Sequence, residues 1–447
     1  MPGAEPAAAR SPDTIAAIAT PPGRGAIGIV RVSGARAPEI TRRLIGRLPE
    51  ARVASFSTAR DAAGRPIDEG LALYFPQPRS YTGEHCLEFH GHGGTVVLHA
   101  VLAACLDAGA RLAEPGEFTR RAFLNGRMDL AQAEAVADLI DAASTEAARS
   151  AMRSLSGEFS AAVHALGAQL VELRALTEAT LDFPEEDVDA LHRDDAAARL
   201  ARLRAGLEEL LARSREGSLL RAGIQVVLAG RPNVGKSSLL NRLAGEERAI
   251  VTPIPGTTRD ALRETILIEG VPLNLVDTAG LRESRDEVER LGVERAQREV
   301  ARADLLLVVH DCTALEGAPP LEAPAAARID VYNKVDLAPG FAAPAGAHPA
   351  LCLSAKTGEG IEALRQAILR AAGWRSHGES VFLARERHLR ALQAAARHLA
   401  GAAEQGGRWE LFAEELRLAH HALGSITGEV TADELLGEIF SRFCIGK

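Results

Sequence analysis

The segment that decides the fold is GRPNVGKSS, residues Gly230–Ser238. It matches the pattern G-x-x-x-x-G-K-[ST], follows the mostly apolar run Ile224–Ala229 and precedes a helical pattern that starts at Leu239. In this strand–loop–helix context the glycines let backbone N–H groups curl around phosphates. Lys236 then reaches the terminal phosphates, and Ser237 ligates Mg²⁺. The segment predicts a P-loop nucleotide site on an α/β sheet.

Three short elements follow the P-loop, and together they indicate which nucleotide binds. Asp277–Gly280 (DTAG) ends a strand-like run, where a carboxylate can hold Mg²⁺ through water. In Asn333–Asp336 (NKVD), Asp336 accepts two hydrogen bonds from guanine N1 and N2, a donor pair that adenine lacks. Ser354–Lys356 (SAK) offers a backbone amide to guanine O6, and Lys334 and Lys356 lie along the two faces of the base. Each element alone could be a solvated turn, but four in this order predict a GTPase.

The group that positions the attacking water is not evident from the motifs. Position 281 holds Leu281, where a Ras-like GTPase has its glutamine, and an aliphatic side chain cannot orient water. Spacing alone does not choose among the acidic residues that follow, Glu283, Asp286, Glu287 and Glu289. A switch-like segment, GTTRD at Gly256–Asp260, carries two hydroxyls, of which Thr258 is the better Mg²⁺ ligand by its place in the motif.

Length and composition fit a multidomain globular protein. At about 150 residues per domain, 447 residues suggest about three domains. Apolar residues make up 47% and charged residues 25%, which argues against a mostly disordered chain. The net charge of −9 gives no overall reason to expect nucleic-acid binding, and it does not exclude a local basic patch.

Lysine is rare in a chain that is rich in arginine. Of the 51 basic residues, four are lysine, at Lys236, Lys334, Lys356 and Lys447. A guanidinium does not replace an ammonium wherever a compact point charge is needed. The four lysines are therefore candidates for functional positions.

The hydrophobic pattern changes character along the chain. Residues 1–125 mix short β-like runs with Gly/Pro turns and a helical stretch at Val96–Ala108, which indicates an α+β domain. Residues 126–217 have helical spacing, residues 218–374 alternate strands with helices, and residues 375–447 are again mostly helical. We expect an α/β domain inserted into a helical one; consecutive, uninterrupted domains are the alternative.

Other features exclude several classes of protein. The five cysteines, Cys86, Cys105, Cys312, Cys352 and Cys444, show no C-x-x-C spacing, so neither a disulfide framework nor a zinc cage is expected. No apolar run approaches about 18 residues, and residues 1–12 lack the apolar stretch of a secretory signal, so a cytoplasmic protein without a membrane span is expected. His90 and His92, two apart, favour a structural turn over a metal site.

Several motifs outside the GTPase segment resemble one family, the bacterial tRNA-modification GTPases called MnmE or TrmE. The resemblance covers essentially the whole chain. Beyond the GTPase motifs it rests on Ala19–Gly25 (ATPPGRG), Tyr81–Glu84 (YTGE), Gly91–Gly94 (GHGG), Arg121–Gly126 (RAFLNG), Asp129–Glu134 (DLAQAE) and Cys444–Lys447 (CIGK).

The resemblance implies a fold and a set of partners. The fold would be a folate-binding N-terminal α+β domain that dimerises, a helical domain and an inserted Ras-like P-loop domain. The partners would be tRNA and the FAD-containing protein MnmG, with which the dimer forms a heterotetramer. Together they would add an aminomethyl or carboxymethylaminomethyl group to C5 of the wobble uridine. The one-carbon unit would come from a tetrahydrofolate derivative, either the 5-formyl or a methylene form.

The resemblance also assigns roles to particular residues. Potassium would supply the charge of an arginine finger, held by Asn233, Thr252, Ile254 and Thr257. Glu289, in Val288–Arg290 (VER), would be the catalytic acid, with Glu283 as the fallback. Cys444 would be the reactive cysteine. Folate would contact Arg31, Glu88, Arg127 and Lys447.

The complete GTP site expected from motifs and resemblance spans five segments of the chain. Its members are Asn233, Val234, Gly235, Lys236, Ser237, Ser238, Thr252, Pro253, Ile254, Pro255, Gly256, Thr257, Thr258, Asp277, Thr278, Ala279, Gly280, Asn333, Lys334, Val335, Asp336, Ser354, Ala355 and Lys356. Two features depart from the family. Pro253 and Pro255 stiffen the loop that would hold potassium. Position 127 is often lysine in the family, and Arg127 shows that an ammonium is not required there.

Two other classes of function are compatible with parts of this pattern. A ribosome-assembly or regulatory switch GTPase usually carries an appended RNA-binding module. The chain has no G-x-x-G loop in a KH context, and this class leaves CIGK unexplained. A folate-binding scaffold with a degenerate nucleotide site is opposed by the intact GKS and NKVD elements.

Overall fold

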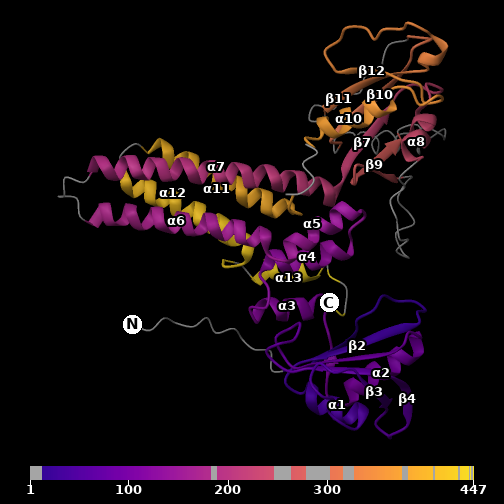
Figure 1. Cartoon of the computed structure of the whole chain (residues 1–447), viewed down its shortest axis with the longest axis vertical. Coiled ribbons are helices and arrows are strands. Elements are labelled where there is room, and N and C mark those ends of the chain that lie inside the picture. The colour runs from indigo at the N-terminus through magenta and orange to yellow at the C-terminus, as the bar shows by residue number, and fades with distance from the viewer. Residues whose placement is uncertain are drawn as a thin grey trace, which may run out of the picture. The chain divides into compact units, whose positions relative to one another are not determined.

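The computed structural model describes residues 13–182, 189–245, 263–277, 303–315, 327–374, 381–405, 408–430, 433–441, 443 and 446 (Figure 1). The chain divides into two compact units. Unit 1 comprises Met1–Ala137 and Gly424–Lys447, and unit 2 comprises Asp138–Leu423. No helix in the described ranges is long and apolar enough to cross a membrane.

Unit 1 is built on a six-stranded sheet with the order β3-β4-β5-β2-β1-β6. All neighbours are antiparallel except β1 and β6, which are parallel. The strands are β1 (Ile15–Ile18), β2 (Ile27–Ser33), β3 (Ser55–Arg60), β4 (Pro66–Phe75), β5 (Cys86–His92) and β6 (Arg111–Leu112).

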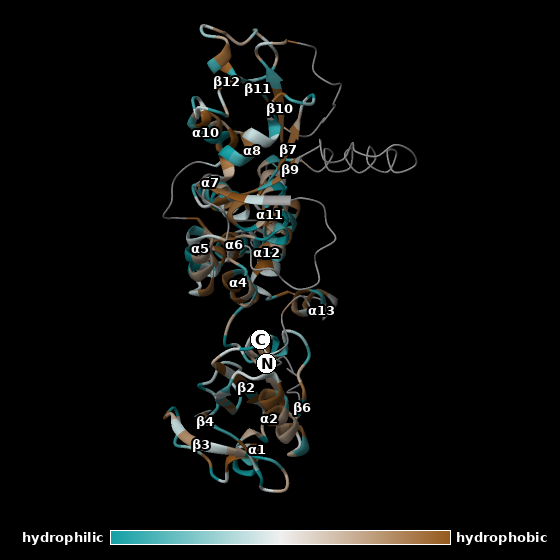
Figure 2. Cartoon of the chain, turned by 90° about the vertical axis from the view of Figure 1, so that its right-hand side faces the viewer, coloured by the Kyte–Doolittle hydropathy of each residue, from teal (hydrophilic) through white to brown (hydrophobic). Residues whose placement is uncertain are grey.

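Helices α1 (Ala37–Ile45) and α2 (Thr95–Asp107) cover one face of this sheet and bury its core. Val30 and Val32 of β2 and Leu87 and Phe89 of β5 point into that core because side chains alternate along a strand. Figure 2 draws α2 mostly in brown, in line with its apolar sequence. The expected helix at Val96–Ala108 is therefore present, shifted by one residue.

The opposite face of β2, β3 and β4 carries exposed apolar side chains. Ile27 is 65% exposed, Phe56 66% and Leu71 43%. Phe56 and Leu71 are cross-strand partners, so their side chains lie on the same face. Near β1 this face is covered instead by α3 (Glu117–Leu124), whose Phe118 packs with Ile15 and Ala17.

Unit 1 also receives the C-terminal helix α13 (Asp433–Ser441). Phe440 and Phe443 form a buried cluster with Leu130 and Ala133, which belong to α4 (Leu130–Ile140). Thus residues more than 300 positions apart in the sequence share one small core.

Unit 2 combines a helical body with a second sheet. The helices of the body are α5 (Thr145–Leu155), α6 (Glu158–Asp182), α7 (Asp189–Ala222), α11 (Glu386–Glu404) and α12 (Trp409–Thr427). Helix α7 packs along α6 and α11. It ends immediately before β7, the strand of the P-loop.

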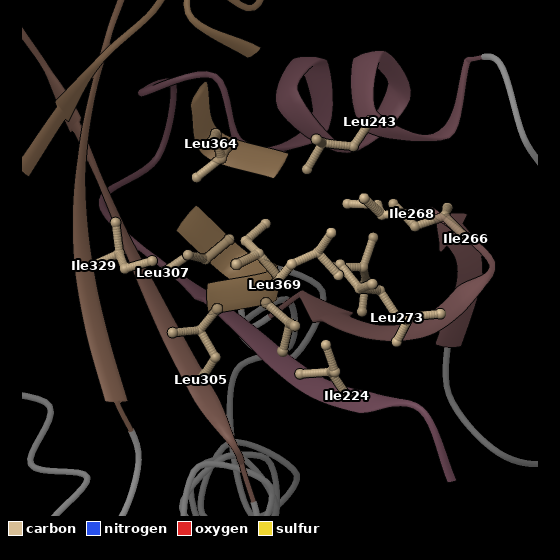
Figure 3. Close-up of a cluster of buried hydrophobic side chains, with 14 of the residues drawn as sticks. Ile224, Leu243, Ile266, Ile268, Leu273, Leu305, Leu307, Ile329, Leu364 and Leu369 are labelled. Atoms are coloured by element: carbon tan, nitrogen blue, oxygen red, sulfur yellow. The ribbon is translucent and has the colours of Figure 1, made fainter. Parts of the chain in front are cut away.

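The second sheet has the order β12-β11-β10-β7-β9-β8, in which all pairs are parallel except β8 with β9. Its strands are β7 (Ile224–Ala229), β8 (Arg263–Ile268), β9 (Val271–Asp277), β10 (Leu305–Asp311), β11 (Ala327–Asn333) and β12 (Ala350–Cys352). Helices α8 (Lys236–Ala244) and α10 (Ile361–Ala371) contribute Leu243, Leu364 and Leu369 to the core on one face (Figure 3).

The chain passes from the helical body into this sheet after α7 and returns to the body at α11. One carboxylate binds an arginine at each of these two connections. Asp138 of α4 accepts hydrogen bonds from Arg221 at 2.9 Å and from Arg385 at 2.8 Å. Arg221 lies in the last turn of α7, and Arg385 precedes α11. Close by, a Cβ on Gly217 would stand 1.6 Å from the carbonyl oxygen of Phe382, so only glycine fits.

These elements confirm the expected fold class. The chain has an α+β N-terminal part, a helical part, and an α/β part placed between α7 and α11 in the sequence.

Candidate functional site

The P-loop adopts a backbone that only particular residues allow. Gly230, Asn233 and Gly235 have φ of 152°, 63° and 97°, a range in which L side chains are strained. A Cβ on Gly230 would stand 2.5 Å from the carbonyl oxygen of Val309, and one on Gly235 would stand 2.2 Å from Asn333 Nδ2. Both glycines are therefore required for the loop to lie this close to β10 and to the last residue of β11.

Lys236 is the first residue of α8 and is 5% exposed. Its Nζ donates to the carbonyl oxygens of Gly230 and Arg231, both at 2.9 Å. The ammonium thus lies across the P-loop at the N-terminus of α8, where it can contact phosphate oxygens. Ser237 and Ser238 are exposed in the first turn of α8, where backbone N–H groups and the helix dipole favour anions.

Asn333 joins the two halves of the nucleotide site. Its Nδ2 donates to the carbonyl oxygen of Val234 at 2.9 Å, and its Oδ1 accepts from the amide of Ala355 at 2.9 Å. Asn333 is 3% exposed, so both bonds are shielded from water. The phosphate loop is therefore held in register with the Ser354–Lys356 loop.

Asp336 and Ser354 are also brought together. Ser354 Oγ donates to Asp336 Oδ1 at 2.6 Å, and the amide of Thr357 donates to Ser354 Oγ at 3.1 Å. This bond fixes the orientation of the Asp336 carboxylate. A carboxylate fixed in this way is suited to accept the paired donors of guanine, and that role of Asp336 stays a prediction.

Two residues that the motifs did not indicate support the guanine loops. Asp311, at the end of β10, accepts a hydrogen bond from Lys334 Nζ. Burial raises the pKa of the Asp311 carboxyl, but hydrogen bonds from Lys334 and Thr313 outweigh it and lower the pKa overall. Arg242 of α8 donates to the carbonyl oxygens of Ala355, at 3.1 Å, and Lys356. Only the position of Asp311 at the end of a buried strand could have pointed to it in the sequence.

The backbone of Asp277 lies at the same edge of the sheet, because it pairs with Leu228 just before the P-loop. Its side chain lies outside what the structure describes. Other predicted site residues also lie outside the described residues. They are the switch residues, the expected catalytic acid with its alternative, and two C-terminal residues: Thr252, Pro253, Ile254, Pro255, Gly256, Thr257, Thr258, Thr278, Ala279, Gly280, Glu289, Glu283, Cys444 and Lys447.

A second group of candidate residues lies on the sheet of unit 1. Arg31 of β2 and Glu88 of β5 are cross-strand partners, and Arg31 Nε and Nη2 both lie 2.9 Å from Glu88 Oε1. The guanidinium also lies 5.2 Å from the ring centroid of Tyr81 and 5.6 Å from that of Phe118. Both charged side chains are 19% exposed, so the pair is positioned yet reaches solvent.

The Tyr81–Glu84 motif packs against the turn that carries Arg127. Asn125 Nδ2 donates to the carbonyl oxygen of Thr82 at 2.8 Å. A Cβ on Gly83 would stand 3.2 Å from Arg127 Cγ, which places the stem of the exposed Arg127 beside this turn. Arg31 and Arg127 therefore contact the same short motif, Arg31 at Tyr81 and Arg127 at Gly83.

A buried ion network holds these turns. Arg121 of α3 is 4% exposed and pairs with Glu117 at 2.8 Å and with Glu84 at 3.2 Å. Burial alone would raise the pKa of Glu117, but hydrogen bonds from Arg111, Glu114 and Arg121 lower it overall. The RAFLNG and YTGE motifs are thus partners in one structure, a relation that their separation in sequence concealed.

The histidines of the GHGG region lie in a strand and not in a turn. His90 and His92 belong to β5 and hydrogen-bond Glu88 at 3.3 Å and Asp68 at 2.7 Å. No cluster of three or more His, Cys, Asp or Glu able to hold a metal occurs within the described ranges.

The comparisons with known proteins cover nearly the whole chain. Residues 130–444 match the family model of the MnmE helical domain, and residues 14–127 match that of the GTP-binding protein TrmE N-terminus. The tRNA modification GTPase MnmE of Azoarcus sp. (strain BH72) is 61% identical, covering 98% of this chain and 99% of that protein. The proteins of the same name from Aromatoleum aromaticum and Thiobacillus denitrificans are 58% and 57% identical, each covering 98% of both chains. These matches establish that the chain belongs to the MnmE (TrmE) family of tRNA modification GTPases.

Proposed function

We propose that the chain is a potassium-dependent GTP hydrolase of the cytoplasm which, with an FAD-containing partner of the MnmG type, modifies C5 of the wobble uridine of tRNA. The product carries an aminomethyl or carboxymethylaminomethyl group. The observation that carries the GTPase part is the Asn333 bridge, because it fixes phosphate and guanine loops in one register. The tRNA part rests on family membership.

The described residues fit a bound GTP. Backbone N–H groups of the P-loop and Lys236 hold the phosphates, and Asp336 with the Ala355 amide reads the guanine. Gly230 and Gly235 admit no Cβ, and a backbone without side chains there would let phosphates approach closely. Ser237, Thr258 and Asp277 hold magnesium, which neutralises charge on the β and γ phosphates. Lys334 and Lys356 cover the faces of the base.

Potassium and Glu289 complete hydrolysis in this proposal. Asn233 is exposed in the loop with a left-handed backbone, so its amide oxygen is available to a cation. Thr252, Ile254 and Thr257 supply the other ligands, and potassium provides positive charge in place of an arginine finger. Glu289 polarises the attacking water, since Leu281 cannot. GTP turnover should rise in potassium over sodium at equal ionic strength, and equal rates in both salts would refute the potassium site.

The sheet of unit 1 is the proposed folate site, with Arg31, Glu88, Arg127 and Lys447 as contacts. Arg31 and Glu88 offer a fixed donor and acceptor pair to a polar heterocycle, and Tyr81 adds an aromatic face. A tetrahydrofolate derivative would supply a one-carbon unit at this site. Cys444 is the reactive thiol of the modification step.

The exposed apolar face of the same sheet supports the proposed homodimer through the N-terminal domain. Ile27, Phe56 and Leu71 are the kind of surface that a second copy would cover. The flavoprotein joins this dimer in a heterotetramer. We propose the domain bounds as 1–125 for the folate domain, 126–217 and 375–447 for the helical domain, and 218–374 for the GTPase domain.

Replacing the thiol separates the two activities. Cys444→Ser should leave GTP turnover near the wild-type rate while the modified wobble uridine disappears from tRNA digests. The matched control is Cys352→Ser, a half-buried cysteine of the other unit, which should retain the modification. Modified uridine at wild-type levels with Cys444→Ser would show that the thiol is dispensable.

A further inference from the structure

The C-terminal segment is attached to unit 1 at two described places. The first is the buried cluster of α13, where Phe440 and Phe443 lie 5.5 Å apart between ring centroids. Gly116 makes this approach possible, since a Cβ there would stand 2.5 Å from the carbonyl oxygen of Phe440 and 3.0 Å from Phe443 Cβ. The segment is therefore anchored up to Phe443 by apolar packing.

The second place is Gly446, which packs against the end of β1. Gly446 is buried and has φ of 98°, a conformation that L side chains rarely adopt. A Cβ on Gly446 would stand 2.4 Å from the carbonyl oxygen of Ile18 and 2.9 Å from Ala19 Cα. Both obstacles are backbone atoms, which cannot rotate out of the way as a flexible side chain could.

Arg31 also contacts Gly446. Its Nη1 donates to the carbonyl oxygen of Gly446 at 3.3 Å, while Nε and Nη2 remain on Glu88. A planar guanidinium can serve both partners at once because its donors form a rigid fork. Glu88 thus fixes the group that binds the C-terminal segment.

We propose that Gly446 is a positioning residue for the tRNA modification step. Its main chain packs against the end of β1 and accepts a hydrogen bond from Arg31, and any side chain at this position would collide with the backbone of Ile18 and Ala19. Consecutive Cα atoms are about 3.8 Å apart, so an anchored Gly446 sets an upper limit on the distance between its sequence neighbours and the Arg31–Glu88 pair. The inference rests on the proposed roles of Cys444 and Lys447, which flank Gly446 in the sequence.

The test compares Gly446→Ala with Gly437→Ala in the full chain. Gly437 lies in α13, and a Cβ there meets nothing within 4 Å, so it is a matched glycine without a steric role. Two quantities are measured. One is the rate at which iodoacetamide alkylates Cys444, read by peptide mass spectrometry relative to Cys352. The other is the amount of modified wobble uridine formed with the flavoprotein partner.

Gly446→Ala should raise the relative alkylation rate and lower the modified uridine, each by about tenfold, which corresponds to about 1.4 kcal/mol. Gly437→Ala should match the wild type in both. Arg31→Lys is a second variant that keeps the charge but cannot reach Glu88 and Gly446 together, and it should raise alkylation in the same direction. This variant keeps the test decisive should Gly446→Ala not fold.

The outcomes distinguish this inference from the function on which it rests. Unchanged alkylation in Gly446→Ala would overturn the positioning role, whatever the modification level. Faster alkylation with undiminished modification would also overturn it, because the contact would then not serve the reaction. Cys444→Ser addresses the proposed function separately: if that variant still modifies tRNA, the function assigned to the thiol fails, independently of how the segment is anchored.

Discussion

Replacing Asn333 by alanine should weaken GTP binding about 30-fold. The side chain joins the phosphate loop to the guanine loop through both ends of its carboxamide, at Val234 and Ala355. Each bond has a net worth of about 1 kcal/mol in a folded protein. Together they contribute about 2 kcal/mol to holding the two loops in register, and that is a factor of about 30 in a dissociation constant.

The loss should appear in affinity because the nucleotide needs both loops at once. Without Asn333, the carbonyl oxygen of Val234 and the amide of Ala355 can bind water in the free protein. Binding GTP then requires the loops to return to register and these groups to lose that water. The alanine also removes the Nδ2 atom that lies against the backbone of Gly235, so the P-loop gains freedom.

Titration of a fluorescent GTP analogue at constant Mg²⁺ measures this effect. The matched control is Asn274→Ala, an asparagine of β9 whose side chain donates to the carbonyl oxygen of Ala222 at 3.1 Å and accepts from Thr265 at 3.0 Å. Its two bonds lie away from the nucleotide loops, so affinity should stay within twofold of wild type. The reasoning is refuted if Asn333→Ala also stays within twofold, or if both variants lose affinity equally.

Three further changes test other parts of the structure. Asp138→Ala removes the carboxylate that Arg221 and Arg385 share. Because Arg385 is largely buried, we expect the local stability to fall by about 3 kcal/mol, which would appear as faster hydrogen exchange where α7 meets β7. Unchanged exchange there would contradict a stabilising role for Asp138. The pKa of Glu117 lies below its usual 4.5, so the ionised carboxylate stabilises the fold at higher pH, and this stabilisation is lost as the pH falls through the lowered pKa. Glu117→Gln should therefore reduce the fall in the melting temperature of unit 1 with decreasing pH. An unchanged pH dependence of that melting temperature would contradict this role of Glu117. Glu289→Ala should retain GTP affinity and lose kcat, and an unchanged kcat would move the catalytic role first to Glu283.

The local elements of the GTPase part could be predicted because their causes are local. A glycine-rich turn after a buried strand and before a helix leaves one arrangement for Lys236, and the structure shows its ammonium across that loop. Asn333 ends β11 and Asp336 follows it, and a strand parallel to the others has to end at the same sheet edge as β7. The scarcity of lysine pointed to Lys236 and Lys334, both of which make specific contacts in the described site.

The residues that the sequence could not reveal act across long separations. Arg242 supports the guanine loop from more than 100 residues away, and Asp138 meets Arg385 across more than 200. Nothing in the spacing of these residues distinguishes them from ordinary helix-surface charges. Glycines such as Gly446 are similar, because a backbone obstacle like the carbonyl of Ile18 is visible only in three dimensions.

The nucleosides of tRNA from cells that lack this chain provide the most direct test of the central claim, that GTP hydrolysis in unit 2 serves wobble-uridine modification. Mass spectrometry of digests should show the C5-modified wobble uridine lost in the deletion strain and restored by the wild-type chain. A Lys236→Ala chain should fail to restore it, because the phosphate grip is gone. Modified uridine that persists in the deletion strain, or full restoration by Lys236→Ala, would contradict the account.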